Sequence, residues 1–414
     1  MEEDALITIL KNMKKENHTM NYKHPLEIPK SNIITGLRWI GEREEAATKG
    51  IYGDTYPMAW AADGEIYMSS GDPNWAYFNG IPRSVGWQEC IPIPELYPNV
   101  GGLDIEKIKG MGSHFDIEQV NTMPGFMGPG GLGAKPSGMI SVNGSLYLAA
   151  QNLLGNKTPP HREKSQHGSD STILRSDDYG RTWVPDIQPL LSEMESRYYD
   201  RESFQWKIPP QERQTWDEWK PMFPGPLFGG PSFVQFGQNN SQSVDEYVYA
   251  ISGDQWDNGI EMRLGRVHQD HILEVKFWEW ANVKQNGSVE WVNSLANSLP
   301  VLTIDGHLGL SEMVYLPSIK RYLLLTWGLH KDFNTEEGSE LTILEAEQPW
   351  GPFSLVYYEE LWDNKEICPY CPRIQLKWFD EKNMSGKMLY SGSWSAPDPW
   401  YKAHVRPFEL IIKR

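Results

Sequence analysis

The sequence has little cysteine, with 3 such residues in a chain of 414. Three thiols, at Cys90, Cys368 and Cys371, are too few for the disulfide framework of a small secreted domain. Cys368 and Cys371 are spaced as C-x-x-C, but a structural zinc site needs about four ligands, and a redox motif of this kind needs a βαβ setting. We therefore interpret both as residues of a loop that leads into the last strand pair, and we predict no metal site and no cofactor.

Long apolar runs and an excess of basic residues are also missing. No apolar run reaches the roughly 20 residues that cross a bilayer, so no membrane partner is expected. Residues 1–20 lack the segments of a secretory signal, which favours a cytoplasmic protein, or a secreted one whose leader has been removed. The formal net charge is −17, and because nucleic-acid-binding surfaces are basic, no nucleic-acid partner is expected. The oligomeric state stays open.

Aromatic residues and turn formers are abundant, with 18 Trp, 19 Tyr, 37 Gly and 30 Pro, a mixture that favours many short strands. One pattern, an apolar strand, a polar turn and a second strand with a tyrosine, recurs at residues 57–70, 137–150, 232–252, 313–327 and 374–394. The tyrosines are Tyr67, Tyr147, Tyr249, Tyr322 and Tyr390. Repeated antiparallel sheets that bury their faces only against one another predict an all-β fold, a five-bladed β-propeller.

The rest of the chain fits around these repeats. Outer strands are predicted at 172–175, 260–266 and 341–346, and a closing strand at 405–412 that completes the first or last blade. We predict an N-terminal arm at 1–34 and a single propeller domain at 35–414. Long loop insertions are predicted at 73–134, 154–170 and 184–227, and loops of this length are often functional.

The first hairpin, residues 53–72, reads GDTYPMAWAADGEIYMSSGD and turns at Asp63-Gly64. Asp54 and Asp72 stand at its two outer ends, which lie side by side in an antiparallel pair. Paired carboxylates are what glycoside hydrolysis requires, one to protonate the leaving oxygen and one to activate water or attack carbon. An aspartate at a strand end often only shapes a turn, so the spacing alone leaves the catalytic role open.

Other residues near the ends of the predicted inner strands are candidates for the same site. Asp254 and Glu312 are further acids, and cations there can hold an acidic substrate or tune a carboxylate. The candidate cations are Lys135, Arg373 and Lys377. Tryptophans at strand ends can stack on sugar rings, or can simply pack in the core. The substrate-binding candidates of this kind are Trp60, Trp75 and Trp327.

Residues 176–183, SDDYGRTW, match the Asp-box pattern S-x-D-x-G-x-T-W. In this motif Asp and Ser bond the turn backbone, Gly supplies a positive φ, and Trp packs beneath the blade. We assign it a structural role only.

Several segments in this order resemble a family of five-bladed propeller proteins that is related to the propeller glycosidases and includes endo-D-arabinanases. They include GDTYPMAWAADGEIYMSSGD, KPSGMISVNGSLYLAAQN, ILRSDDYGRTW, FGGPSFVQFGQNN and YLPSIKRYLLLTWG. The resemblance implies an active site in the axial funnel, with catalytic aspartates at Asp54 and Asp72, and Lys135 and Lys377 match recurring positions. Relatives tend to carry a glycine after the second aspartate, and this chain has proline there, so the arabinan substrate is not carried over.

The sequence is compatible with three functions. The first is a glycoside hydrolase acting on an oligo- or polysaccharide, with Asp54 and Asp72 as acid and base in an order the sequence does not fix, and with inversion expected from the resemblance alone. The second is a polysaccharide lyase, which the negative net charge disfavours for an acidic polymer. The third is a propeller that binds carbohydrate without cleaving it.

Overall fold

The computed structural model describes residues 20–45, 53–71, 103–109, 116–123, 135–151, 168, 170–185, 199–200, 205–206, 221–330, 337–363, 367–392 and 402–413. Within these ranges almost all regular structure is strand, and no helix has the length and apolarity of a membrane-crossing segment.

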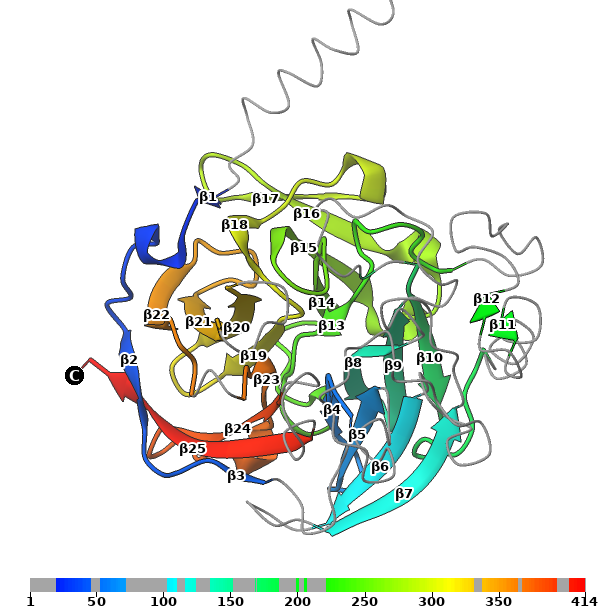
Figure 1. Ribbon diagram of the computed structural model, residues 1–414. Coiled ribbons are helices and arrows are strands. Elements are labelled where there is room, and N and C mark those ends of the chain that lie inside the picture. The colour runs from blue at the N-terminus through cyan, green and yellow to red at the C-terminus, as the bar shows by residue number, and fades with distance from the viewer. Residues whose placement is uncertain are drawn as a thin grey trace, which may run out of the picture.

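Three sheets follow one another along the first three quarters of the chain (Figure 1). The first contains β4 (Met58–Trp60), β5 (Ile66–Gly71), β6 (Leu103–Lys109) and β7 (Asp116–Met123). The second contains β8 (Lys135–Val142), β9 (Ser145–Gln151) and β10 (Thr172–Ser176). The third contains β13 (Ser232–Phe233), β14 (Tyr247–Gly253), β15 (Gly259–His268) and β18 (Leu302–Leu308), with β16 (Glu279–Val283) and β17 (Val289–Val292) branching from β15.

Two further sheets complete the set, and a short pair stands apart from it. The fourth sheet contains β19 (Glu312–Leu316), β20 (Arg321–Leu329), β21 (Ser339–Ala346) and β22 (Ser354–Glu359). The fifth contains β23 (Tyr370–Ile374), β24 (Ser385–Ser391), β25 (Ala403–Ile412), β2 (Ile34–Trp39) and β3 (Glu44–Glu45). The separate pair is β11 (Tyr199–Asp200) with β12 (Gln205–Trp206).

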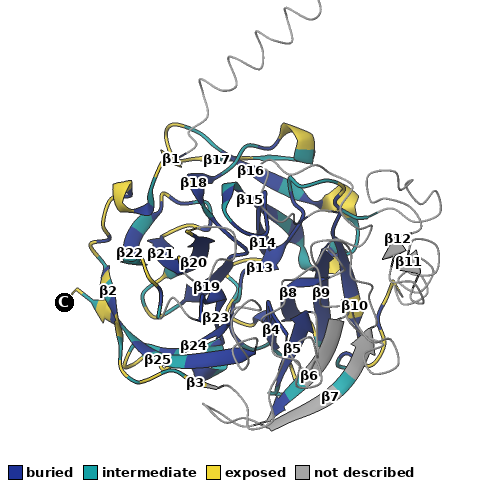
Figure 2. Ribbon diagram, viewed as in Figure 1, coloured by how far each residue is buried: buried dark blue, intermediate teal, exposed yellow. Residues whose placement is uncertain are grey.

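The sheets close into a ring because each buries apolar side chains against the next one (Figure 2). Between the first and second sheets, for example, Ala59 and Tyr67 join Leu148 in one cluster. Between the fifth and first sheets, Met58 and Leu389 share another. Since the last sheet packs on the first, the fold is a five-bladed β-propeller, as the sequence pattern predicts, and the sheets are its blades 1 to 5 in the order given.

Both ends of the described chain take part in blade formation. Strand β25, predicted as a closing strand, is the third strand of blade 5, and β2 from the N-terminal region pairs antiparallel with it. Strand β1 (Met20–Tyr22) pairs in parallel with β18 at the edge of blade 3. The predicted arm at 1–34 is therefore too long, because the chain is already part of the propeller from Met20 onward; residues 1–19 lie outside the described residues.

The repeated hairpins are present, with the five repeat tyrosines on the second strand of each blade and all buried. Blade 5 begins earlier than predicted, because its first strand is Tyr370–Ile374. The segment Leu376–Trp378 is a short 3-10 helix, where the Gln375 side chain accepts from the Lys377 N–H. Cys371 consequently lies within β23 and not in a loop, while Cys90 lies outside the described residues.

Two of the predicted loop insertions contain strands. Strands β6 and β7 of blade 1 fall in the insertion predicted at 73–134, and β11 and β12 fall in the one at 184–227. Most of the segment predicted as a loop at 154–170 lies outside the described residues. The sequences of β6 and β7, LDIEKIK and DIEQVNTM, mix charge with apolar residues, which suits an outer strand with one solvated face.

The turn at residues 176–183 is closed by its own side chains. The Asp178 carboxylate accepts from the Thr182 N–H at 2.9 Å and the Thr182 hydroxyl at 2.7 Å. Ser176 Oγ accepts from the Gly180 N–H at 2.7 Å, and Gly180 has a φ of 93°. Trp183 is buried and donates to the Gly180 carbonyl. These bonds fix the turn that follows β10, and they hold Trp183 in the apolar cluster between blades 1 and 2.

Candidate functional site

The innermost strands of the blades begin at the same end of the propeller axis. The first residues of β8, β13, β19 and β23 are Lys135, Ser232, Glu312 and Tyr370, and Asp54 lies four residues before β4. Arg373, on the inner strand of blade 5, contacts residues of all four other blades at this end. We call Asp54, Lys135, Glu312, Tyr370 and Arg373, with the adjoining Trp256, the axial cluster.

Asp54 is held at the start of blade 1 by backbone and side-chain contacts. Its N–H and C=O both bond to Gly71, the last residue of β5, at 2.8 and 2.9 Å. The carboxylate is buried, and its Oδ2 atom lies 3.1 Å from the Lys135 ammonium and 3.5 Å from the Tyr370 hydroxyl. A Cβ at position 71 would lie 2.6 Å from Asp54 Oδ1, so this approach requires glycine. The ammonium stabilises a negative charge on the carboxylate.

The backbone just after Asp54 is strained. Thr55 and Tyr56 have φ values of 64° and 40°, in the left-handed region that a β-branched residue such as threonine rarely adopts. Such a conformation costs about 1–3 kcal/mol and persists only when its surroundings over-determine it. Here the Thr55 N–H donates to Ser391 Oγ at 3.1 Å, and the Thr55 carbonyl accepts from Arg373 Nε at 3.0 Å. Strain of this kind clusters at functional sites.

Glu312 joins blade 4 to blade 5 within the axial cluster. Its Oε2 accepts from the Ile374 N–H at 2.6 Å, and its Oε1 lies 3.8 Å from the Arg373 guanidinium. Burial raises the pKa of Glu312 to about 7, although the Arg373 charge and the Ile374 hydrogen bond act in the opposite direction. Burial therefore favours the neutral, protonated form of Glu312 within the cluster.

Three buried rings pack beside the polar groups of the axial cluster. Trp256, Trp327 and Tyr370 lie with ring centroids 5.4 to 5.5 Å apart. Lys135 Nζ lies 5.4 Å from the Trp256 ring, close enough for a cation–π contact. Trp327 is fully buried and donates to the Leu310 carbonyl at 3.1 Å. The rings therefore form an apolar wall beside the polar groups, and the buried Trp327 offers no open stacking surface.

The structure brings together some of the residues predicted from the sequence. Asp54, Lys135, Glu312, Trp327 and Arg373 lie at the same end of the axis. Asp254 is also buried, but its Oδ1 accepts from the N–H groups of Ile260 and Glu261 and closes the loop before β15.

Two other predicted residues lie elsewhere. Trp60 is next to the turn of the β4–β5 hairpin, at the opposite end from Asp54. Lys377 donates to the Gly64 carbonyl in that same turn at 2.6 Å, with Glu65 at 3.7 Å. Neither is part of the axial cluster. Asp72, which follows Gly71, and Trp75 lie outside the described residues.

The sequence pattern does not indicate Tyr370, because it predicts a loop there and starts the fifth repeat at residue 374. In the structure Tyr370 begins an inner strand, just as Lys135 and Glu312 do. No group of three or more His, Cys, Asp or Glu in the described part of the chain is arranged to hold a metal ion.

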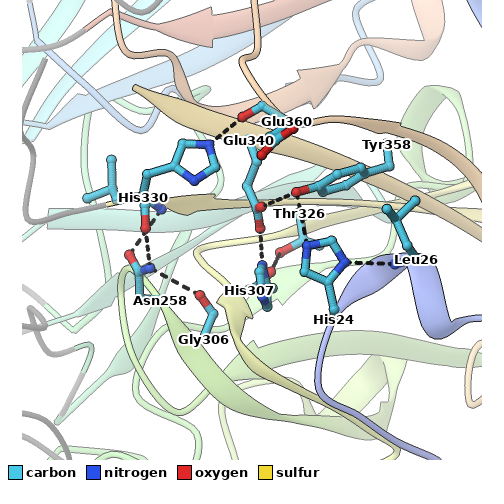
Figure 3. A network of polar contacts seen from close by, with 11 residues as sticks. His24, Leu26, Asn258, Gly306, His307, Thr326, His330, Glu340, Tyr358 and Glu360 are labelled. Atoms are coloured by element: carbon cyan, nitrogen blue, oxygen red, sulfur yellow. Dashed lines mark hydrogen bonds and ion pairs between the residues drawn. The ribbon is translucent and has the colours of Figure 1, made fainter. Parts of the chain in front are cut away.

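A second polar network lies where blades 3 and 4 meet the N-terminal segment (Figure 3). The Tyr358 hydroxyl donates to Glu340 Oε2 at 2.7 Å and lies 3.3 Å from His24 Nε2, while the other Glu340 oxygen pairs with His307 Nδ1. His24 Nδ1 in turn accepts from the Leu26 N–H. Since these groups satisfy one another, the network fastens the N-terminal segment to blades 3 and 4.

No protein-family model and no curated protein matches this sequence. Solved structures that resemble the fold include a protein of unknown function from Dyadobacter fermentans, at 12% identity and a TM-score of 0.47 over 91% of this chain and 100% of that one. Another is an α-L-arabinofuranosidase from Podospora anserina in complex with cellotriose, at 9% identity and a TM-score of 0.44 over 91% and 98% of the two chains. A third is an endo-arabinase from Bacteroides thetaiotaomicron, at 11% identity and a TM-score of 0.39 over 90% and 98%.

Proposed function

We propose that the protein is a glycoside hydrolase that acts on an oligo- or polysaccharide at the axial cluster. The observation that carries this proposal is the buried Asp54 carboxylate at the meeting point of the inner strands, paired with Lys135 and presented by a strained turn. A charged carboxylate in a water-poor site is suited to accept a proton. The Asp-box role proposed for the turn at 176–183 is structural and separate from this site.

In the proposed mechanism Asp54 is the base and Asp72 is the acid. Asp54 takes a proton from a water molecule as that water attacks the anomeric carbon. The bond from this carbon to the glycosidic oxygen breaks, and that oxygen receives the proton of Asp72. This inverting route needs the two carboxyl groups about 6.5–9.5 Å apart. Because Asp54 is buried, productive binding must open a path to its carboxylate.

The test compares the wild type with Asp54→Asn and Asp72→Asn on a panel of plant and bacterial glycans, read by released reducing ends. We expect both variants to lose cleavage while staying folded at the assay temperature. Asp54→Asn should have a lower Tm than the wild type, because it leaves the buried Lys135 ammonium uncompensated. Lys377→Gln is the matched control, since Lys377 lies at the other end of the first hairpin, and it should cleave normally. Cleavage that survives both Asp substitutions would contradict the proposal.

A non-catalytic glycan-binding propeller is the second candidate, and one observation favours it. Asp54 is 1% exposed and already paired with a lysine, as in a purely structural ion pair. If this candidate is correct, the wild type releases no reducing ends from any glycan but is retarded by one in affinity electrophoresis. Asp54→Asn would then bind that glycan as well as the wild type does.

A further inference from the structure

We propose that Arg373 is the positioning residue of the axial site, because its guanidinium holds the left-handed turn at Thr55 and thereby fixes the Asp54 carboxylate. The catalytic meaning of this role rests on the function proposed above, whereas the geometric role does not depend on it.

The first argument is the reach of the Arg373 side chain. Nε donates to the Thr55 carbonyl of blade 1, and one terminal nitrogen donates to the Ser137 carbonyl of blade 2, each at 3.0 Å. The other terminal nitrogen donates to Ser232 Oγ of blade 3 at 3.0 Å and lies 3.8 Å from Glu312 of blade 4. Only the planar, five-donor fork of arginine serves partners in so many directions, because a lysine ammonium is a compact point charge.

The second argument is that one of these contacts is made to the strained residue, Thr55. Thr55 is hydrogen-bonded on both sides, at its N–H to Ser391 and at its carbonyl to Arg373. Without the hydrogen bond to the carbonyl, relaxation of Thr55 to a negative φ lowers the backbone energy. That rotation turns the peptide that carries Asp54 and moves its carboxylate away from Lys135. A displacement of about 1 Å at a reacting group can lower a rate about 100-fold.

A residue that only joins the blades would behave differently. In that case the loss of Arg373 would lower the Tm but leave Thr55 and Asp54 in place, because the Ser137 and Ser232 contacts would account for its stabilising effect. The positioning role instead couples Arg373 to the conformation of one residue, Thr55.

The main experiment is the crystal structure of Arg373→Lys together with steady-state kinetics on the best glycan. We expect Thr55 to leave the left-handed region, the Asp54–Lys135 ion pair to open, and kcat to fall at least tenfold with KM within twofold. Arg263→Lys is the matched control: Arg263 is another buried arginine, on the third strand of blade 3, and bonds to Ser298 and Glu261. An Arg373→Lys structure with Thr55 and Asp54 unmoved would overturn the proposal.

A second variant covers the case in which Arg373→Lys does not fold. Thr55→Gly supplies a residue that adopts a positive φ without strain, so the loss of Arg373 releases no strain in this background. We expect Arg373→Lys to lower the Tm by a larger amount in Thr55→Gly than in the wild type, where relaxation of Thr55 offsets part of the loss. If Arg373→Lys folds in one background only, that background should be Thr55→Gly, because it starts without the strain. Equal losses in both backgrounds, or failure to fold in both, would assign Arg373 to blade contacts alone.

These readouts separate the two proposals. If the wild type cleaves no glycan, the hydrolase proposal fails, and the crystal structure and the Tm comparison still decide the role of Arg373. If the wild type cleaves and Thr55 stays fixed in Arg373→Lys, the positioning proposal fails on its own.

Discussion

At the scale of single residues, the buried pair of Asp54 and Lys135 is costly to break on one side only. Removing one partner of a buried ion pair leaves an uncompensated charge and costs about 3–5 kcal/mol. We expect Lys135→Met to lower the free energy of unfolding by about this amount in urea denaturation.

The matching double variant tests the cause of that loss. Asp54→Asn/Lys135→Met removes both charges and should recover a large part of the stability that Lys135→Met loses. A double variant no more stable than Lys135→Met would show that the ammonium acts through packing on Trp256 and not through charge.

Glu312 makes stability depend on pH in a direction opposite to that of most carboxylates. Its pKa rises from 4.5 to about 7 on folding, chiefly through burial, so the folded chain binds this proton more tightly than the unfolded chain. The stabilisation is fully present below about pH 4.5 and is lost as the pH rises through about 7.

The variant Glu312→Gln stays neutral at every pH and can still accept from the Ile374 N–H. Relative to this variant, the wild type should lose about 3 kcal/mol of unfolding free energy between pH 4.5 and 8, from the conversion of a pKa shift to free energy. Urea denaturation of both proteins across this range checks the difference. A difference that does not change with pH would contradict the raised pKa.

At the scale of elements, the N-terminal segment depends on the Tyr358 hydroxyl. Tyr358→Phe removes the donor to Glu340 and the partner of His24, and hydrogen bonds to charged groups contribute about 1.5–3 kcal/mol each. We expect the variant to lose stability of this order and to lose hydrogen-exchange protection in β1 and at the Leu26 amide.

The neighbouring Tyr357→Phe is the matched control, because Tyr357 also donates to a carboxylate, that of Glu359, without touching His24. It should lower stability but leave the exchange of β1 unchanged. Equal protection of β1 in both variants would show that the His24 contact does not hold the segment.

Local pattern predicted the repeated hairpins because each carries its own turn signal and its own tyrosine. It missed β6 and β7, where charges interrupt the apolar alternation, and it placed the start of blade 5 too late because β23 is short and contains cysteine and proline.

For the site, hairpin geometry gave the end at which Asp54 lies. The same geometry puts Trp60 beside the turn of the hairpin, at the opposite end from Asp54, so the sequence alone already argues against placing Trp60 in the site. Tyr370 and Arg373, the neighbours of Asp54, come from a different blade. Arg373 is among the predicted cations, but no local pattern reports which side chains of separate blades meet on the axis.

At the scale of the whole molecule, the blades approach one another so closely near the axis that one added carbon atom would collide with the neighbouring blade. A Cβ on Gly138 of blade 2 would lie 2.5 Å from the Pro231 carbonyl and 2.7 Å from the Ser232 Cα, both backbone atoms near the start of blade 3. We expect Gly138→Ala to cost about 1–3 kcal/mol, since overpacking forces the backbone to shift.

Gly36→Ala is the control, because its added Cβ meets only the Ile411 side chain, at an ordinary 3.6 Å. The midpoints of urea denaturation for the two variants check this contrast. A Gly138→Ala protein as stable as Gly36→Ala would mean that blades 2 and 3 can move apart at no cost.

The pairing of β2 with β25 has a consequence for synthesis on the ribosome. Strand β2 is made among the first residues of the described chain, and its partner β25 is made among the last. Blades 1 to 4 take their inner strands from consecutive stretches and can assemble as the chain emerges, since domains generally fold as they are made. Ile34 and Leu37 on β2 are buried in the folded protein, but they stay exposed until β25 has been made and pairs with β2. The synthesis of β25 thus decides when the propeller becomes a closed ring.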